Sequence, residues 1–343
     1  MPKKVKYVDF WEDFEPSNNF LQQSLDAIGC EVELSENPDY LFCSVFGHEA
    51  LDKKYDDCIK IFYTGENICP DFNLYDYAIG FEYLDFGDRY LRYPLYYAYS
   101  KGLWDSLMTK HCNIQEKLAK KSGFCSFVYS NGNGNPIRER FFSNLSEYKK
   151  VDSGGRYLNN IGMPEGVKDK IEFESQYKFS IAFENSSHPG YTTEKLIQSF
   201  AAGTVPIYWG DTDAKKVFNS ESFIFVNDFE SLDDVVDKVR EVDQNDGLYF
   251  KYLGTPALIE PEKFDREKQK KELEKFLRNI FEQDKEKAFR RNRIFWGKRY
   301  HKEMHMAFDA LEDKASKTLA EKVLYTFRKE GLSGIFNRIK EKL

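Results

Sequence analysis

The sequence has no apolar run that approaches the roughly 20 residues needed to cross a bilayer. Its first ten residues carry Lys3, Lys4 and Lys6 and then alternate like a strand, unlike the apolar core of a signal peptide. It also lacks a surplus of positive charge, because 50 Lys and Arg stand against 57 Asp and Glu, for a formal net charge of -7. Binding a phosphate backbone needs such a surplus, so nucleic acid is excluded as the main partner. We expect a soluble, cytoplasmic protein.

Cysteine pairs of the metal-binding kind are missing too. The six cysteines form no CxxC motif and all lie before residue 126. They indicate neither a zinc site nor a disulfide framework, and reduced thiols in a cytoplasm are what we expect.

The chain is long enough and apolar enough for about two globular domains. Of its 343 residues, 41% are hydrophobic and 16% are aromatic. Short apolar runs alternate with polar, helix-like stretches, which is typical of a βα succession. In the first part we predict strands at 5–10, 40–46, 58–63 and 77–81, with a helix at 17–28.

The second part alternates in the same way and predicts another α/β sheet. Strands are predicted at 124–129, 179–183 and 205–208, with helices near 194–202 and through 275–299. The Lys-rich passage 110–121 changes both composition and period, so we place the domain junction there. We therefore predict two open α/β sheets that face each other. The predicted parts are a first domain (1–120), a second domain (121–300) and a helical C-terminal tail (301–343).

One strand–loop–helix–strand segment has the features of a phosphate site. It runs through Phe183-Glu184-Asn185-Ser186, Tyr191-Thr192-Thr193-Glu194-Lys195 and Gly203-Thr204-Val205-Pro206-Ile207-Tyr208-Trp209-Gly210. Ligands of open α/β sheets bind at the carboxyl ends of the strands, where a helix N-terminus offers unpaired N–H groups to a phosphate. Taken singly, Glu194 could merely complement the helix dipole, Lys195 could be solvated and Asn185 could belong to a turn.

As a whole, the segment resembles the signature of glycosyltransferase family 10, the α1,3-fucosyltransferases: FENS…Y-x-TEK…G-x-VPI-x-x-G. The resemblance implies a GT-B fold in which the C-terminal domain holds the donor, GDP-fucose. It implies that Asn185, Tyr191, Glu194 and Lys195 line the donor site. In this reading Lys195 contacts the diphosphate and Glu194 lies near the ribose or the fucose ring.

Two upstream stretches resemble further blocks of the same family. Residues 127–138 match SN-x…P-x-R, and residues 151–160 match VD-x-x-G. Arg156, in the second block, is our candidate for the other cation that holds the diphosphate. The alternative is a surface Arg in a Gly turn.

The segment Ile61-Phe62-Tyr63-Thr64-Gly65-Glu66-Asn67 runs from a predicted strand into a turn that carries a carboxylate. Inverting transfer needs a general base for the proton of the attacking hydroxyl, and aromatic shielding of Glu66 would raise its pKa toward neutrality. An ordinary turn carboxylate is the alternative. The run YTGEN-x-x-P-x-FN-x-x-DYAIGF-x-x-LDF-x-DRYLR-x-PLYYAY resembles the N-terminal domain of the Helicobacter members of the family. This resemblance implies that Glu66 is the base, with Tyr63 and Asn67 beside it.

Asp211-Thr212-Asp213 imitates the DXD tract with which other glycosyltransferases hold manganese. We interpret it as a turn after a strand, because GT-B enzymes of this type do not use that motif. The resemblance implies no metal and no other cofactor. Lys195, a second cation and the helix dipole would stabilise the departing GDP.

A dense aromatic and cationic cluster has a spacing that suits either sugar stacking or a core with a solvated edge, and we favour the core. It comprises Arg89, Tyr90, Arg92, Tyr96 and Tyr97, and Trp11 is interpreted in the same way.

The segment Leu319–Leu343 places apolar residues at helical spacing among Lys and Arg, the pattern of an interfacial helix. The hypothesis is peripheral contact with the inner membrane. A helix that packs back on the domains, or lies solvated, is the alternative.

The sequence thus predicts an enzyme that transfers L-fucose from GDP-fucose to an oligosaccharide acceptor. The resemblance implies O3 of N-acetylglucosamine in a LacNAc-type acceptor, giving a Lewis-type decoration of a lipopolysaccharide or capsule. One alternative is a relative with another GDP-sugar or linkage. Another is a catalytically silent glycan-binding relative, which would have no chemical need for Glu66, Glu194 and Lys195 together.

Overall fold

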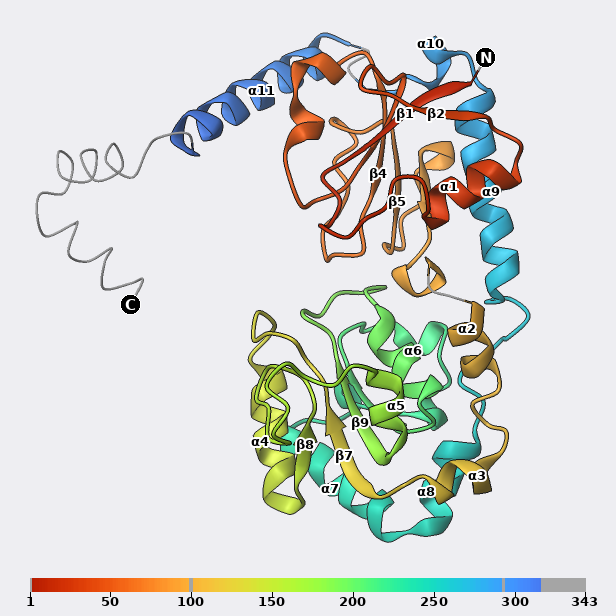
Figure 1. Cartoon of the computed structure of the whole chain (residues 1–343), viewed down its shortest axis with the longest axis vertical. Coiled ribbons are helices and arrows are strands. Elements are labelled where there is room, and N and C mark those ends of the chain that lie inside the picture. The colour runs from red at the N-terminus through yellow and green to blue at the C-terminus, as the bar shows by residue number, and fades with distance from the viewer. Residues whose placement is uncertain (1, 99–100, 292–293, 316–343) are drawn as a thin grey trace, which may run out of the picture.

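The computed structural model describes residues 2–98, 101–291 and 294–315. Two α/β bodies face each other, and the long helix α11 (Phe295–Ala315) projects from the first (Figure 1). The segment Leu319–Leu343 lies outside the described residues, so its membrane contact stays a prediction. No helix in the described part of the chain is both long and apolar enough to span a membrane.

The first body is built on a six-stranded parallel sheet with the strand order β2-β1-β3-β4-β5-β6. Its strands are β1 (Lys3–Val8), β2 (Val32–Leu34), β3 (Tyr40–Cys43), β4 (Ile59–Tyr63), β5 (Tyr77–Gly80) and β6 (Tyr90–Arg92), and α1 (Phe20–Ala27) follows β1. Every residue of β3, β4 and β5 is buried, as expected for parallel strands covered on both faces. The four predicted strands and the predicted helix are confirmed.

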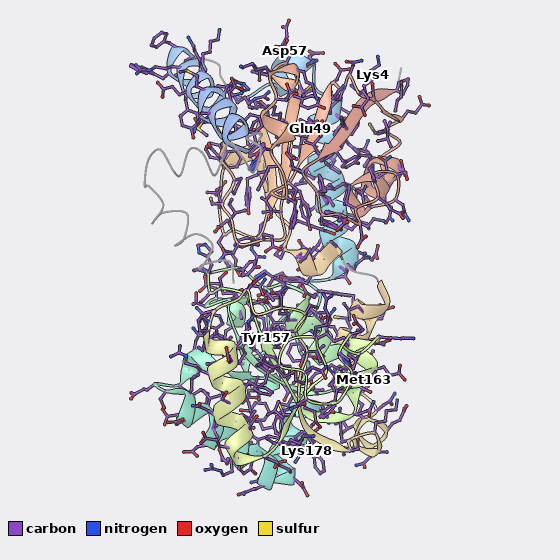
Figure 2. The ribbon with its side chains drawn as sticks, turned by 60° about the vertical axis from the view of Figure 1, so that its left-hand side comes forward. Lys4, Glu49, Asp57, Tyr157, Met163 and Lys178 are labelled. Atoms are coloured by element: carbon purple, nitrogen blue, oxygen red, sulfur yellow. The ribbon has the colours of Figure 1, made fainter. Side chains whose placement is uncertain are left out.

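The second body is built on a five-stranded parallel sheet with the order β11-β10-β9-β7-β8. Its strands are β7 (Gly123–Phe127), β8 (Val151–Ser153), β9 (Tyr177–Phe183), β10 (Val205–Trp209) and β11 (Ile224–Phe225). Its helices are α4 (Ile137–Tyr148), α5 (Lys170–Ser175), α6 (Glu194–Ala201), α7 (Leu232–Gln244) and α8 (Asp246–Gly254). Figure 2 shows the side chains, with Glu49 and Asp57 on the first body and Tyr157 and Met163 on the second. The fold prediction of two facing α/β sheets is confirmed.

Helices at the domain junctions pack on the other body than the predicted boundaries at 120 and 300 imply. The helices α2 (Lys101–Met108) and α3 (Ile114–Ala119) pack against α6 and α8 of the second body. Conversely, α9 (Arg266–Glu282) packs against α1, and Phe281 stacks on Tyr40 with ring centroids 4.2 Å apart. A change of composition marks a linker, but it does not reveal on which sheet a later helix packs.

After α9, the short helix α10 (Lys285–Ala288) leads the chain along the first body. There Arg291 and Asp76 form an ion pair whose two side chains are both fully buried. Asp76 also accepts hydrogen bonds from the backbone N–H groups of Lys60, Arg290 and Arg291 at 2.8, 2.7 and 2.9 Å. This pair fixes the returning chain to the first sheet.

Candidate active site

Loops at the carboxyl ends of the two sheets meet between the bodies. The loop after β4 reaches the loop after β9, because Asn67 donates a hydrogen bond to the Ser186 hydroxyl at 2.7 Å. Beside it, His188 Nε2 lies 3.0 Å from a Glu82 carboxylate oxygen of the first body. Residues of both bodies therefore contribute to one site, as is expected where the carboxyl ends of two α/β sheets face each other.

Gly190 lets the loop after β9 approach the backbone at the end of β5. Its φ of 86° lies in the left-handed region, and a Cβ here would stand 2.7 Å from the carbonyl oxygen of Phe81. Only glycine fits this position without displacing the neighbouring backbone.

Glu66 lies on the turn after β4, where its N–H donates to the Thr64 hydroxyl at 2.9 Å. Its side chain is exposed, so the aromatic shielding expected from the sequence is not found. Tyr63 is fully buried and belongs to the core of the first body, although Asn67 is a neighbour as predicted. The Glu66 charge acts on Tyr191 of the second body, so this turn lies near the donor segment.

Tyr191 connects this turn to the donor segment. Its buried ring packs edge-on against Phe81, with centroids 5.0 Å apart. Burial raises the pKa of Tyr191, and the negative charges of Glu184, Glu66 and Glu194 raise it further. The phenol therefore stays protonated among three carboxylates.

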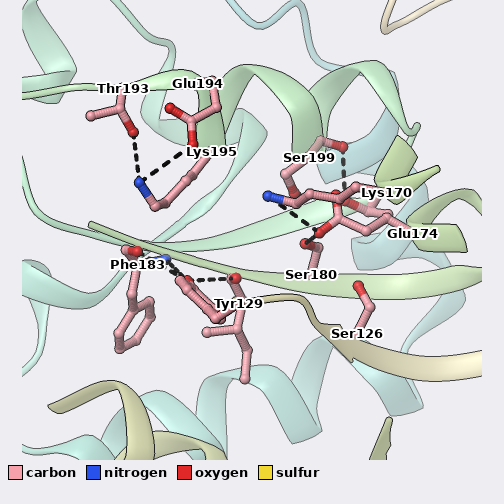
Figure 3. Close-up of polar contacts among 12 residues, drawn as sticks. Ser126, Tyr129, Lys170, Glu174, Ser180, Phe183, Thr193, Glu194, Lys195 and Ser199 are labelled. Atoms are coloured by element: carbon pink, nitrogen blue, oxygen red, sulfur yellow. Dashed lines mark hydrogen bonds and ion pairs between the residues drawn. The ribbon is translucent and has the colours of Figure 1, made fainter. Parts of the chain in front are cut away.

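The N-terminus of α6 gathers most of the predicted donor residues. Thr193 occupies the N-cap position with extended backbone, and Glu194 and Lys195 form the first turn (Figure 3). Lys195 Nζ lies 3.0 Å from the Thr193 hydroxyl and 3.5 Å from a Glu194 carboxylate oxygen. Burial alone would lower the pKa of Lys195, but Glu184 and Glu194 raise it, so the ammonium stays charged.

Glu184 is a residue to which the sequence analysis gave no role. Its side chain is 0% exposed, and its carboxylate accepts hydrogen bonds from Thr193 N at 2.8 Å, Thr193 Oγ1 at 2.6 Å and Lys195 Nζ at 3.1 Å. Burial raises its pKa, and Lys195 opposes that shift. Glu184 therefore fixes both the start of α6 and the Lys195 ammonium. A Glu directly after a predicted strand, at its carboxyl end, was the sequence signal.

Arg138, in the first turn of α4, is a second buried cation at this edge. It is 3% exposed, its guanidinium lies over the Tyr129 ring at 4.7 Å, and Nη1 donates to Asn185 Oδ1 at 3.3 Å. Its Nη2 is buried and has no hydrogen-bond partner among the described residues. Gly134 lies against Nη2 and leaves no room for a Cβ. A buried cationic donor of this kind is suited to bind an anion.

Arg156, the cation chosen from the sequence, is exposed on the neighbouring loop. That loop packs on Tyr129, whose carbonyl accepts the Tyr157 N–H at 3.0 Å. The structure thus brings Arg138 rather than Arg156 into contact with Asn185. Arg138 is the last residue of the SN-x…P-x-R block, so the sequence motif did include this cation.

The Asp211-Thr212-Asp213 tract forms a turn after β10. The Asp211 carboxylate accepts hydrogen bonds from Gly190 N at 2.6 Å, Thr192 Oγ1 at 2.8 Å and Asp213 N at 2.8 Å. Burial raises the pKa of Asp211, against the effect of these bonds. Its oxygens therefore hold the donor loop in place.

A cavity of about 450 Å³ opens in the first body. It is lined by Trp11, Asp13, Phe14, Glu15, Asn18, Asn19, Phe20, Tyr63, Leu95 and Ala98. Trp11 is 40% exposed and packs edge-on against Phe14 at 5.0 Å, so its interpretation as a core residue is wrong. Tyr96 and Tyr97 are buried, which confirms the core interpretation for these two.

Comparison with known proteins identifies the two bodies. Residues 5–99 match the family "Alpha-(1,3)-fucosyltransferase FucT N-terminal domain", and residues 118–301 match "Glycosyltransferase family 10 (fucosyltransferase) C-term". The chain is 35% identical over 287 residues to the Alpha-(1,3)-fucosyltransferase FucT of Helicobacter pylori, which covers 74% of this chain and 59% of the relative. A putative fucosyltransferase of Acanthamoeba polyphaga mimivirus is 31% identical over 60% of this chain and 35% of its own length. The chain thus spans only part of these two relatives.

Solved structures agree with the sequence matches. A crystal structure of an α1,3-fucosyltransferase with GDP superposes with a TM-score of 0.68 at 32% identity, covering 82% of this chain and 91% of that one. The complex with GDP-fucose gives a TM-score of 0.67 at 31% identity over the same shares of the two chains. The two facing sheets therefore form a GT-B fold, and the chain belongs to glycosyltransferase family 10, the fucosyltransferases.

Proposed function

We propose that this chain transfers L-fucose from GDP-fucose to a sugar hydroxyl with inversion, O3 of N-acetylglucosamine in a LacNAc-type surface glycan being the proposed acceptor. The observation that carries the proposal is the meeting of the Glu66 turn with a donor loop flanked by two cations, the buried Arg138 and the largely buried Lys195. Relatives named as α1,3-fucosyltransferases support the reaction type.

The donor diphosphate would bind between Arg138, Lys195 and the N-terminus of α6. Arg138 Nη2 is a buried donor in need of an acceptor, and Lys195 is a charged ammonium already fixed by Glu184. Two positive charges and a helix N-terminus stabilise the charge that develops on GDP as the bond to fucose breaks. We therefore propose that the reaction requires no metal ion.

Glu66 would act as the general base. The acceptor oxygen attacks C1 of fucose, its proton passes to the Glu66 carboxylate, and the C1–O bond to GDP breaks so that GDP keeps the electron pair. An exposed carboxylate suits this role in the free enzyme, because the acceptor must reach it before the site closes.

The acceptor would bind in the cavity that contains Trp11 and Phe14. Their faces can pack on the C–H face of a sugar ring, while the side chains of Asp13 and Asn18 offer partners for hydroxyl groups. Tyr63 lines this cavity, and the Glu66 turn follows it directly.

The first experiment measures GDP release from GDP-fucose with N-acetyllactosamine in the presence of EDTA. Glu66→Gln should lower kcat at least about 100-fold and leave GDP binding intact, whereas Glu147→Gln, an exposed Glu on α4, should behave like the wild type. Full activity of Glu66→Gln would refute the assignment of the base.

A second experiment tests the donor site by calorimetry. Arg138→Met should weaken binding of GDP about 10- to 100-fold, because charged hydrogen bonds contribute about 1.5–3 kcal/mol, and should leave guanosine binding unchanged. Arg140→Met, an exposed Arg of the same helix, is the matched control. Equal GDP affinity in both variants would contradict the site.

Two further proposals can also be tested. Tight GDP-fucose binding without turnover on any acceptor would favour the silent glycan-binding alternative. Peripheral membrane contact through Leu319–Leu343 is tested by liposome sedimentation of the full chain against one that ends near residue 311, and equal pelleting of the two would end that idea.

A further inference from the structure

Three side chains outside the candidate active site converge between the first body and α11. His301 and His305 lie one turn apart on α11, so their imidazoles project from the same face. Asp56 follows η2 (Lys53–Tyr55), a 3-10 helix of the first body. In the sequence, Asp56 and His305 are 249 residues apart. One ligand atom from each of the three residues lies within 4.8 Å of the others.

The spacing of these atoms fits a single ion. Asp56 Oδ1 lies 2.9 Å from His305 Nε2 and 3.6 Å from His301 Nε2. Ligands at about 2 Å from a tetrahedral zinc ion stand about 3.3 Å from one another. The three atoms are therefore already spaced as a ligand set.

His301 supplies an independent indication of a ligand. It is 8% exposed, and its Nε2 is buried without a hydrogen-bond partner in the part of the chain that the structure describes. Buried polar atoms are nearly always paired, because an unpaired one has lost its water. A metal ion would satisfy this nitrogen, and imidazole is the commonest metal ligand.

Neighbouring positive charges are paired with other groups. Lys53 pairs with Asp309 at 2.8 Å, and Lys60 Nζ donates to the Ala50 carbonyl at 2.6 Å. Arg291 pairs with Asp76, and its Nη2 also donates to the backbone carbonyl of Asp56 at 2.8 Å, which leaves the Asp56 carboxylate to the two histidines. Lys298 and Lys302 are exposed. A cavity of about 330 Å³ bordered by these lysines reaches the cluster, so an ion has an entry path and a fourth ligand has room.

We propose that Asp56, His301 and His305 bind one divalent transition-metal ion, with zinc as the best match and water as the fourth ligand. Two imidazoles and one carboxylate form a ligand set that zinc uses. The ion lies apart from the donor site and takes no part in the transfer reaction. It fastens α11 to the first body, next to the hydrogen bond from the Tyr300 hydroxyl to Asp71 at 2.6 Å.

The test uses the full chain without a histidine tag or nucleotide, freed of metal by a chelator and then dialysed. Titration with Co²⁺ should give the visible absorption bands of a tetrahedral ion, saturate at about one ion per chain and reverse on addition of Zn²⁺. His301→Gln and Asp56→Asn should lose at least about 100-fold in affinity. His111→Gln, which changes an exposed histidine elsewhere, should bind as the wild type does. No binding by the wild type, or equal binding by His301→Gln, would overturn the proposal.

A second measurement needs no variant and is therefore independent of folding defects. One equivalent of Zn²⁺ should shift the imidazole NMR signals of His301 and His305 in the wild type, while the signals of the exposed His111 stay unchanged. Unshifted His301 signals at saturating Zn²⁺ would also overturn the proposal.

Discussion

Glu184→Gln tests the strongest electrostatic claim about the donor loop. The amide keeps one oxygen for the Thr193 N–H, which now lies 2.8 Å from Glu184 Oε1, but it replaces the oxygen that faces Lys195 Nζ at 3.1 Å. The pair is largely buried, with side-chain exposures of 12% for Lys195 and 0% for Glu184. Removing one partner of a buried pair costs about 3–5 kcal/mol. Because Glu194 remains 3.5 Å from Lys195 and still pairs with it, we expect a loss of folding free energy at the low end of this range, about 3 kcal/mol.

The assay is denaturant unfolding combined with a double-mutant cycle. A loss of about 3 kcal/mol should also lower the melting temperature, by roughly 4 °C for a chain of this length. Lys195→Met and the double variant complete the cycle, and a coupling energy of about 2 kcal/mol is expected for residues in direct contact. Glu172→Gln, at an exposed position of α5, controls for loss of charge alone. A coupling energy below about 0.5 kcal/mol would refute the claim that the pair organises this loop.

Three other outcomes follow from the same geometry. Asp76→Asn should cost about 3–5 kcal/mol in denaturant unfolding, because it leaves Arg291 as an unpaired buried charge; a loss below about 1 kcal/mol would show that the pair is dispensable. Gly190→Ala should abolish GDP-fucose turnover more than GDP binding, because its Cβ would push Phe81 of the first body away from the donor loop, and unchanged kcat would count against a closed site. Glu174 is buried, which raises its pKa above 4.5 despite Lys170 and Ser180. Its ionised form therefore reduces stability above that pKa, so Glu174→Gln should be more stable than the wild type near pH 8, with the gain vanishing as the pH falls to about 4.5; a gain independent of pH would exclude this cause.

Most of the fold was predictable because its information is local. The apolar runs that became β3, β4, β9 and β10 are four to seven residues long, enough to show a strand pattern. Strands β2, β6 and β8 have three residues each, which is too few to show the alternation of a strand in the sequence. They form because a longer neighbouring strand provides hydrogen-bonding partners along its edge.

The candidate site was predictable to the extent that its residues are consecutive. Thr193, Glu194 and Lys195 share one turn of α6, so the motif fixes their positions. The contact of Arg138 with Asn185 joins residues 47 apart, and the sequence motifs pointed to Arg156 instead. Likewise, the exposure of Glu66 depends on how the turn packs, which no local pattern encodes. The ligand set of Asp56, His301 and His305 has the longest separation and was missed.

The return of α9 to the first body has a consequence for synthesis on the ribosome. Phe276 and Phe281 cover Tyr77 and Tyr40 of the first sheet, with ring centroids 6.1 and 4.2 Å apart, and Arg291 neutralises the buried Asp76. These residues emerge from the exit tunnel only after the whole second body has been translated. The nascent N-terminal sheet must therefore wait, with one apolar face uncovered, while residues 123–254 are able to fold first. We therefore expect the usual order of domain folding, N-terminal first, to be reversed in this chain, with the second body as the platform on which the first is completed.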